Sequence, residues 1–275
     1  MVIGIVGLGL MGGSFSLALR ASKISAKILG FDKNQKHLEQ AKNLGLVDEI
    51  VKFEDIKKAD IIILAIPVEA IIESFKELKD ISSNSTIIDL GSTKKEIVLK
   101  TPKEIRENFV AAHPMAGTEN FGPQAAFKEL YNGKIVVLCN IEKNSTLHKT
   151  RAIEVFEALK MQIVYMDAKE HDMHAAYISH LPHAISYALA NSVLKQEDPK
   201  SILTLAAGGF KDMSRIAKSS PNMWSDIFKQ NKKNLLYSIN SFEDELKYAK
   251  KMIEDDRHEE LKEWMQNATT LHQII

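Results

Sequence analysis

A glycine-rich turn near the start of the sequence has the spacing of a dinucleotide-binding site. Gly7, Gly9 and Gly12 form the pattern G-x-G-x-x-G. The pattern follows an apolar stretch at residues 2–6 and opens a segment of helical periodicity. The first glycine permits a tight turn, the second lets the backbone approach a pyrophosphate, and the third lets helix and strand pack closely. The residues expected to bind the cofactor here are Gly7, Gly9, Leu10, Met11 and Gly12.

Asp32 stands where such a site places the acid that contacts the adenosine ribose. It follows a predicted strand at residues 27–31, about 20 residues after Gly12, which is the spacing typical of this fingerprint. A carboxylate accepts hydrogen bonds from both ribose hydroxyls and repels a 2′-phosphate, so NAD is favoured over NADP. Lys33 and Lys36 are close in the sequence and weaken this preference.

Two further loops should border the same cofactor. Pro67 follows a predicted strand at 61–66, and Ser92 follows another at 86–89. Ligands of open α/β sheets bind beyond the carboxyl ends of the strands, which favours a place near the cofactor for both residues. Both also have an ordinary structural explanation, because proline is common in the first turn of a helix and serine is a common N-cap.

His113 is the candidate for proton transfer. It comes just after a predicted strand at 108–111. A neutral imidazole can accept a hydroxyl proton near neutral pH, which the oxidation of an alcohol requires. A single loop histidine is more often structural, but its position beside the predicted dinucleotide site favours a catalytic role.

The second half of the sequence offers groups for binding an anion. Four histidines occur close together, at His171, His174, His180 and His183. Their spacing fits no common zinc site and no cysteine is near, so we expect no metal, and one or two of them should contact an anion or a carbonyl group. Arg215 offers a guanidinium that can grip a carboxylate through two hydrogen bonds. Its alternative is a surface pair with Asp212.

The elements around these residues predict two domains. Up to residue 166, short runs rich in Val and Ile alternate with helical segments, which predicts βαβ units and an α/β domain with a mostly parallel sheet. The expected strands are 2–6, 27–31, 61–66, 86–89, 108–111, 135–139 and 163–166. From residue 167 the pattern is helical throughout. We therefore expect a dinucleotide-binding domain at 1–166 and an all-α domain at 167–275.

Helix boundaries are marked by individual residues. Asn34 should begin a helix that ends at Gly45. Within the helical domain, proline after a polar residue predicts new helices at Asp198-Pro199 and Ser220-Pro221. A further start is expected at Ser241, which has capping-box spacing to an acid three residues on.

The composition excludes several classes of function. The 275 residues contain 36 Lys plus Arg and 36 Asp plus Glu, so the formal net charge is zero. A nucleic acid or an anionic membrane would require a basic surface, and we expect neither partner. The single cysteine, Cys139, rules out a disulfide framework and indicates a reducing, cytoplasmic location. Residues 1–19 carry no charge, but their glycines and the late first basic residue, Arg20, speak against a membrane span or a signal peptide.

Five motifs occur in the order in which a known family carries them. They are GLGLMGGS at 7–14, GSTK at 91–94, HPMAGTEN at 113–120, SHLPH at 179–183 and GFKDMSRIA at 209–217. Through them the sequence resembles the prephenate/arogenate dehydrogenase family of tyrosine biosynthesis over essentially its whole length. The resemblance implies a Rossmann-type domain followed by a helical domain that forms a homodimer. It also implies NAD-dependent oxidative decarboxylation of prephenate to 4-hydroxyphenylpyruvate and CO2.

The resemblance gives the candidate residues their roles. His113 is expected to act at the 4-hydroxyl of the substrate, with Ser92 as a hydrogen-bond partner near that hydroxyl and the nicotinamide. His183 is expected to contact the side chain of the substrate, and Arg215 to bind a carboxylate. The positions near the site with less defined roles are Glu119 and His180, and Lys94 is a further candidate for holding the dicarboxylate.

Three alternatives stay open at this point. Arogenate, the substrate of an arogenate (cyclohexadienyl) dehydrogenase, carries an amino group where prephenate has a keto group, and His183 favours prephenate. A β-hydroxyacid dehydrogenase shares the glycine turn but uses a lysine on a helix after a glycine-rich motif, an arrangement not found near the domain junction. A nucleotide-sensing protein would not need His113, Ser92 and Arg215 together. Neither a chorismate mutase segment nor a regulatory domain is evident, so a monofunctional core enzyme is expected.

Overall fold

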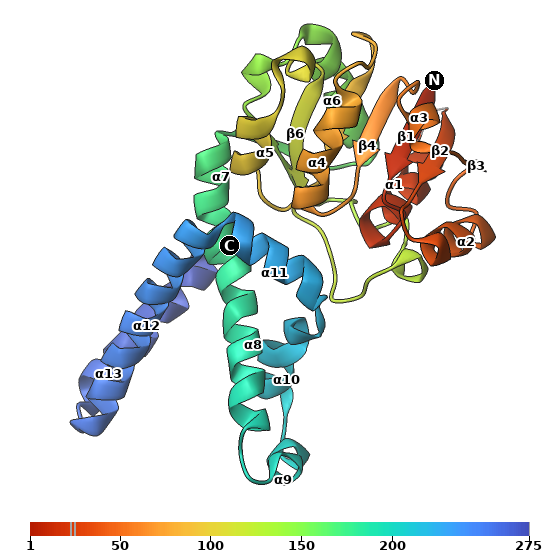
Figure 1. The fold of residues 1–275 in the computed structure, drawn as a ribbon. Coiled ribbons are helices and arrows are strands. Elements are labelled where there is room, and N and C mark those ends of the chain that lie inside the picture. Colours follow the sequence, from red (N-terminus) through yellow and green to blue (C-terminus); the bar gives the residue numbers. More distant parts are fainter. Residues whose placement is uncertain (23, 25, 275) are drawn as a thin grey trace. The chain divides into compact units, whose positions relative to one another are not determined.

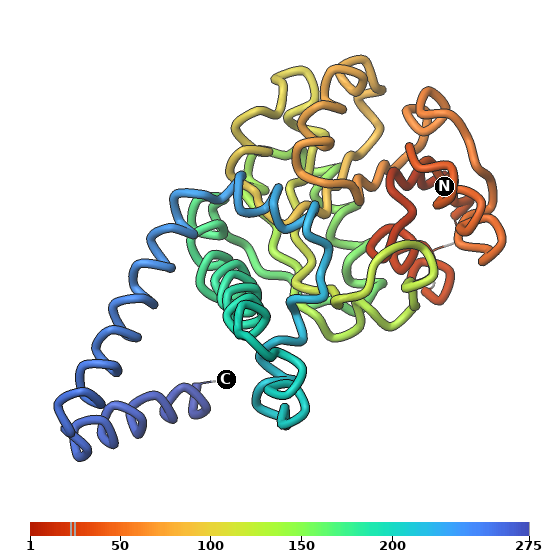
Figure 2. Tube along the Cα trace, turned by 60° about the horizontal axis from the view of Figure 1, so that its bottom comes forward, coloured from red at the N-terminus to blue at the C-terminus, as the bar shows by residue number. Residues whose placement is uncertain are grey.

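The computed structural model describes residues 1–22, 24 and 26–274. By their internal contacts these residues form two compact units, 1–231 and 232–275. Figure 1 shows the helices and strands, labelled where there is room, and Figure 2 traces the chain through both units.

An eight-stranded sheet is the framework of the first unit, with the strand order β3-β2-β1-β4-β5-β6-β7-β8. The strands are Val2–Val6 (β1), Lys27–Phe31 (β2), Glu49–Ile50 (β3), Ile61–Leu64 (β4), Thr86–Asp89 (β5), Phe109–Pro114 (β6), Ile135–Cys139 (β7) and Gln162–Met166 (β8). Neighbours run parallel except β6 and β7, which are antiparallel. The predicted Rossmann-type domain with a mostly parallel sheet is therefore confirmed. Chain order reverses between β1 and β4, where open α/β sheets bind their ligands.

Helices cover both faces of this sheet and produce two apolar clusters. Successive residues of β4 point to opposite faces, as the period of two in a strand requires. Ile63 packs in one cluster with Phe15 of α1 (Leu10–Ala21). Ile62 packs in the other with Phe75 of α4 (Val68–Leu78). Because both faces are covered, β4 and β5 are buried over their full length, which explains the unbroken apolar sequence of β4.

The remaining helices of residues 1–166 lie between these strands in the chain. They are α2 (Gln35–Asn43), α3 (Phe53–Ile56), α5 (Lys95–Lys100) and α6 (Thr146–Ala158). The Asn34 side chain accepts a hydrogen bond from the backbone N–H of Lys36, and Gly45 has a φ of 64° just beyond α2. Both predicted boundaries of that helix are thus confirmed.

Beyond β8 the described residues of the first unit contain helices and no strand. These are α7 (Ala168–Ala175), α8 (Leu181–Leu194), α9 (Pro199–Thr204), α10 (Gly208–Ser214) and α11 (Pro221–Gln230). Asp198 and Ser220 accept hydrogen bonds from backbone N–H groups in the first turns of α9 and α11. The helix starts predicted at these two positions are confirmed.

The second unit consists of α12 (Lys232–Glu254), α13 (His258–Thr269) and a final 3-10 turn, Thr270–Gln273. The helix start predicted at Ser241 is wrong, because α12 runs through it without interruption. The buried positions Leu235, Ser238, Ala249 and Met252 lie on one face of this helix. That continuous periodicity outweighs a local capping signal. None of the described helices combines the length and the apolar character needed to cross a membrane.

Candidate active site

The glycine turn joins β1 to α1 at the carboxyl edge of the sheet. Gly7 has a φ of 91°, which glycine adopts without strain, and a Cβ there would overlap the carbonyl oxygen of Ala65. A Cβ on Gly12 would overlap the carbonyl oxygen of Gly7. Gly9 has open space around it, and no side chain caps the first turn of α1. The N-terminus of this helix can therefore receive a phosphate group.

Asp32 lies directly beside this turn. Its carboxylate accepts hydrogen bonds from the backbone N–H groups of Leu8 and Asn34, both at 2.8 Å. His37 approaches from α2, with Nδ1 at 3.2 Å from the Asp32 carboxylate. The sequence pattern did not single out this histidine beside Asp32.

The two loops predicted to border the cofactor differ in structure. Pro67 takes the N-cap position of α4, three residues beyond Leu64, the last residue of β4. Ser92 lies half-buried between β5 and α5, and the cap of α5 is Lys94 instead. The N-cap explanation for Ser92 is therefore wrong. Among the described residues its hydroxyl has no hydrogen-bond partner.

Lys94 is completely buried and forms an ion pair with Asp89 at the end of β5. Its ammonium group also donates to the carbonyl oxygen of Ala112 at 2.7 Å. The Asp89 carboxylate further accepts the N–H groups of Gly91 and Ala112, each at 3.1 Å. Burial raises the pKa of Asp89, and the neighbouring ammonium acts in the opposite direction. The expectation that Lys94 holds the substrate does not fit this burial.

His113 lies within β6 and not after it, because the antiparallel pairing with β7 extends that strand to Pro114. Its ring is nine-tenths buried, and Nδ1 lies 2.8 Å from Nε2 of His171 on α7. Burial lowers the pKa of His113 well below the ordinary imidazole value. His171, Lys94 and His180 lower it further through their charges. His113 is therefore neutral at neutral pH.

His171 in turn contacts the residue that follows it. Its Nδ1 lies 2.8 Å from Oδ1 of Asp172, and both side chains are almost completely buried. Asp172 Oδ1 accepts the backbone N–H of Lys94 at 2.8 Å, and Oδ2 accepts that of Lys95 at 3.0 Å. An unbroken hydrogen-bonded chain thus connects the start of α5 to the ring of His113. His174, on the same helix, is exposed.

Two more histidines follow at the start of α8. His183 stacks on Trp224 of α11, with ring centroids 3.4 Å apart, and its Nδ1 lies 2.9 Å from the carbonyl oxygen of Ser179. His180 Nδ1 lies 3.1 Å from Nδ2 of Asn231. Burial lowers the pKa of both histidines, that of His180 to about 4. Nε2 of His180 is buried with no partner among the residues that the structure describes.

Arg215 pairs with Glu119 across the first unit. Its Nη1 donates to Glu119 Oε2 at 2.9 Å, and the Arg215 side chain is 55% exposed. The surface pair considered with Asp212 is not found among the described ion pairs. Arg215 is close enough to His183 to lower the pKa of that histidine. The groups predicted to bind an anion are therefore neighbours: His180 near His113, and Arg215 near His183.

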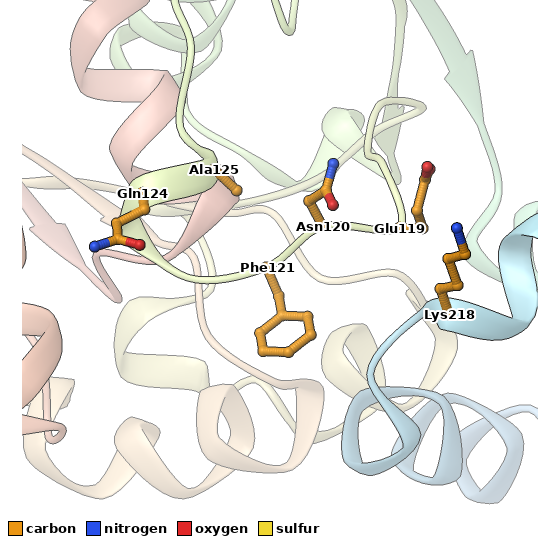
Figure 3. Close-up of a pocket in the computed structure, with 6 residues that line it drawn as sticks. All are labelled: Glu119, Asn120, Phe121, Gln124, Ala125 and Lys218. Atoms are coloured by element: carbon orange, nitrogen blue, oxygen red, sulfur yellow. The ribbon is translucent and has the colours of Figure 1, made fainter.

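A hollow of about 510 Å³ adjoins the Arg215–Glu119 pair. It is lined by Glu119, Asn120, Phe121, Gln124, Ala125 and Lys218. Figure 3 shows the Glu119 and Lys218 side chains at one end of it and Gln124 at the other. Within the described ranges no group of three or more His, Cys, Asp or Glu side chains could hold a metal ion.

The comparison with protein families shows to which family this chain belongs. The model of the prephenate dehydrogenase nucleotide-binding domain matches residues 15–165, and that of the prephenate dehydrogenase dimerization domain matches 167–267. The chain belongs to the prephenate dehydrogenase family.

Individual prephenate dehydrogenases and their relatives are similar to nearly the whole chain. It is 31% identical to prephenate dehydrogenase of Bacillus subtilis, over 96% of this chain and 73% of the relative. It is 32% identical to cyclohexadienyl dehydrogenase of Zymomonas mobilis, over 91% and 88%. A crystal structure of prephenate dehydrogenase from A. aeolicus with hydroxyphenyl propionate and NAD+ has 35% identity and a TM-score of 0.92, covering 99% of this chain and 97% of that one.

Several residues of this candidate site were not singled out from the sequence. His171 was named among four clustered histidines but received no role of its own, and Asp172 and Trp224 had none. Asp172 follows His171 directly, which is the one local signal that could have marked the pair. The stacking of Trp224 on His183 depends on the packing of α11 against α8, which no spacing indicates.

Proposed function

We propose that this member of the family is an NAD-dependent prephenate dehydrogenase, which converts prephenate to 4-hydroxyphenylpyruvate and CO2. The observation that carries the proposal is the neutral, buried imidazole of His113 at the same sheet edge as the glycine turn. β4 and β5 lie between β1 and β6 in the sheet. At roughly 4.8 Å per strand spacing, the ends of β1 and β6, and with them the glycine turn and His113, are about 14 Å apart. An extended dinucleotide covers that distance.

The residues at the turn fit NAD as the cofactor. The uncapped N-terminus of α1 can hold the pyrophosphate, and Asp32 can accept the ribose hydroxyls while disfavouring a 2′-phosphate. Pro67 and Ser92 complete the proposed cofactor loops. NAD+, when bound, accepts the hydride from the ring carbon that carries the hydroxyl.

His113 acts on the hydroxyl of that carbon. Its neutral ring accepts the proton as the C–H and O–H bonds break, and it stabilises the positive character that develops on the oxygen. The bond to the ring carboxylate then breaks, CO2 leaves, and the ring becomes aromatic. Ser92, whose hydroxyl is unpaired in the described part of the chain, donates a hydrogen bond near the same oxygen.

The remaining groups hold the substrate. Arg215 binds a carboxylate, for which Glu119 must yield or share the guanidinium that it now contacts. His183 contacts the side chain of the substrate with Nε2, because its Nδ1 donates to the Ser179 carbonyl oxygen. Nε2 of the neutral ring carries a lone pair, so a hydrogen bond from it to a keto oxygen requires the protonated ring. His180 contributes its unpaired Nε2.

NADH formation with prephenate, arogenate and 3-hydroxyisobutyrate, each offered separately, tests the proposal. We expect turnover with prephenate. Turnover with arogenate alone would establish the second candidate function, arogenate dehydrogenase. The similarity to a cyclohexadienyl dehydrogenase supports this candidate. Turnover confined to 3-hydroxyisobutyrate would indicate a β-hydroxyacid dehydrogenase, and an inactive protein would overturn the proposal.

We further propose that residues 167–275 bind substrate and form a homodimer, which the dimerization-domain match supports. Apolar side chains are exposed in both units after residue 166, among them Leu194, Leu205, Tyr237 and Leu246. Light scattering should give twice the chain mass of 30.8 kDa. A cytoplasmic location is proposed from the single, buried cysteine.

A further inference from the structure

We propose that His171 and Asp172 are positioning residues that set the tautomer of His113, leaving its Nε2 free to accept the substrate proton. The effect on catalysis that we infer rests on the proposed function. The tautomer of His113 itself can be measured without substrate.

The argument starts at Asp172, because its carboxylate can only accept hydrogen bonds. Oδ1 accepts the N–H of Lys94 and Oδ2 accepts that of Lys95. The backbone of the same residue is also anchored, since its carbonyl oxygen accepts a hydrogen bond from Asn231 Nδ2 at 2.6 Å. Asp172 therefore presents a fixed acceptor to the ring of His171.

The proton positions on both imidazoles follow from that acceptor. His171 Nδ1, at 2.8 Å from Asp172 Oδ1, must carry a proton, so Nε2 of the neutral ring carries a lone pair. His113 Nδ1, at 2.8 Å from that lone pair, must then donate. In neutral His113 the proton on Nδ1 leaves Nε2 unprotonated, and no described residue occupies Nε2 with a hydrogen bond. Nε2 is the only ring nitrogen left to act as a base.

The opposite arrangement would remove that base. A His171 ring protonated on both nitrogens would donate to His113 Nδ1 and force the remaining proton of neutral His113 onto Nε2. Among the described residues the acceptor that faces His171 Nδ1 is the carboxylate of Asp172, whereas Nε2 faces only Nδ1 of His113, so this geometry favours the proton on Nδ1. The observed surroundings thus hold the productive tautomer.

The same chain stabilises His113 after it has accepted the proton. The imidazolium keeps its Nδ1–H bond to His171, whose own Nδ1–H points to the Asp172 carboxylate. The positive charge is spread by polarisation of two hydrogen bonds that end on an anion, and no proton needs to reach Asp172. His171 and Asp172 therefore act through His113 and touch neither substrate nor cofactor.

The test compares His171→Leu, which removes the acceptor, with His171→Gln, whose side-chain oxygen can replace it. His174→Leu, an exposed position on the same helix, is the matched control. Ring ¹⁵N shifts of labelled protein, with His113 assigned through His113→Asn, report which nitrogen carries the proton. We expect the Nδ1–H tautomer in the wild type and in His171→Gln, and a shift to the Nε2–H tautomer in His171→Leu.

Turnover supplies the second measurement. His171→Leu should lower kcat by about 10–100-fold, less than the loss expected from removing the general base itself. KM should change little, and His171→Gln should recover most of the rate. An Nε2–H tautomer in the wild type, or unchanged kcat and tautomer in His171→Leu, would overturn the inference. If the wild type shows the Nδ1–H tautomer but turns over none of the substrates, the proposed function fails while the positioning of His113 stands. The wild-type spectrum decides the tautomer even if His171→Leu does not fold.

Discussion

Lys94 lies fully buried against Asp89, and its ammonium group joins the end of β5 to the Ala112 carbonyl of β6. Lys94, which the sequence suggested as a ligand for the substrate, thus instead connects β5 and β6 in the interior of the protein. It also lies close enough to His113 to oppose protonation of that ring. A structural ion pair thereby helps to keep the proposed base neutral.

Replacing this lysine should destabilise the fold strongly. Lys94→Met leaves the buried Asp89 carboxylate without its counter-charge, and breaking a buried pair in this way costs about 3–5 kcal/mol. Urea unfolding would measure the loss. Adding Asp89→Asn to Lys94→Met removes the isolated charge, so the double variant should be more stable than the single one. A single variant as stable as the wild type would show that the pair contributes little.

The location of the proposed site could be predicted from the sequence because the carboxyl ends of parallel strands lie at one edge of the sheet. Gly7, Asp32, Ser92 and His113 each follow or end a strand whose carboxyl end lies at one sheet edge, so strand assignment alone brings them to that edge. The glycine spacing then distinguishes the cofactor end. An error of three residues in a strand end, as at β6, which was predicted to end at 111 and ends at Pro114, does not disturb this argument.

Contacts between distant side chains could not be predicted in the same way. The sequence does not indicate that Lys94 turns inward toward Asp89, because a lysine in a loop is usually solvated. His113 and His171 are 58 residues apart and meet only through the packing of α7 beside α5. Arg215 likewise pairs with Glu119 and not with the acid one helical turn before it.

Removing the proposed base should affect the chemical step. His113→Asn lacks a group that can take up a proton near neutral pH, so kcat should fall by about 10²–10⁴-fold. The measurement is NADH formation at saturating prephenate. Prephenate affinity and the unfolding midpoint serve as controls and should change little. Unchanged turnover would remove His113 from the mechanism.

The acid next to the glycine turn should determine the choice of cofactor. Asp32→Ser removes the carboxylate that would repel a 2′-phosphate, so kcat/KM for NADP should rise relative to NAD. The variant also loses the carboxylate that accepts the N–H of Leu8, so the unfolding midpoint is the control for damage to the turn. Steady-state kinetics with both cofactors measure the ratio. A wild type that already prefers NADP would contradict this role for Asp32.

Acidification should destabilise the protein through its buried histidines. Burial lowers the pKa of His180 to about 4, whereas the unfolded chain titrates near the ordinary value of about 6.5. Stability is therefore complete above about pH 6.5 and declines as the pH falls toward 4, because the unfolded state takes up the proton first. His180 should account for about 1–2 kcal/mol of the loss between about pH 7 and 5. His180→Gln should reduce the pH dependence of the unfolding free energy, and an unchanged slope would argue against a neutral buried ring.

Replacing the proposed carboxylate ligand should weaken binding more than it affects stability. Arg215→Gln removes the guanidinium, so KM for prephenate should rise at least tenfold, a loss of about 1.4 kcal/mol or more in binding. Its ion pair with Glu119 is largely solvent-exposed, and such pairs contribute little to folding, so the melting temperature should stay nearly constant. Glu119→Gln is the matched control, because it removes the same ion pair but leaves the guanidinium available. If Arg215 binds a carboxylate, only Arg215→Gln raises KM strongly. Equal effects of both variants on Tm with no change in KM would instead show that the pair is structural.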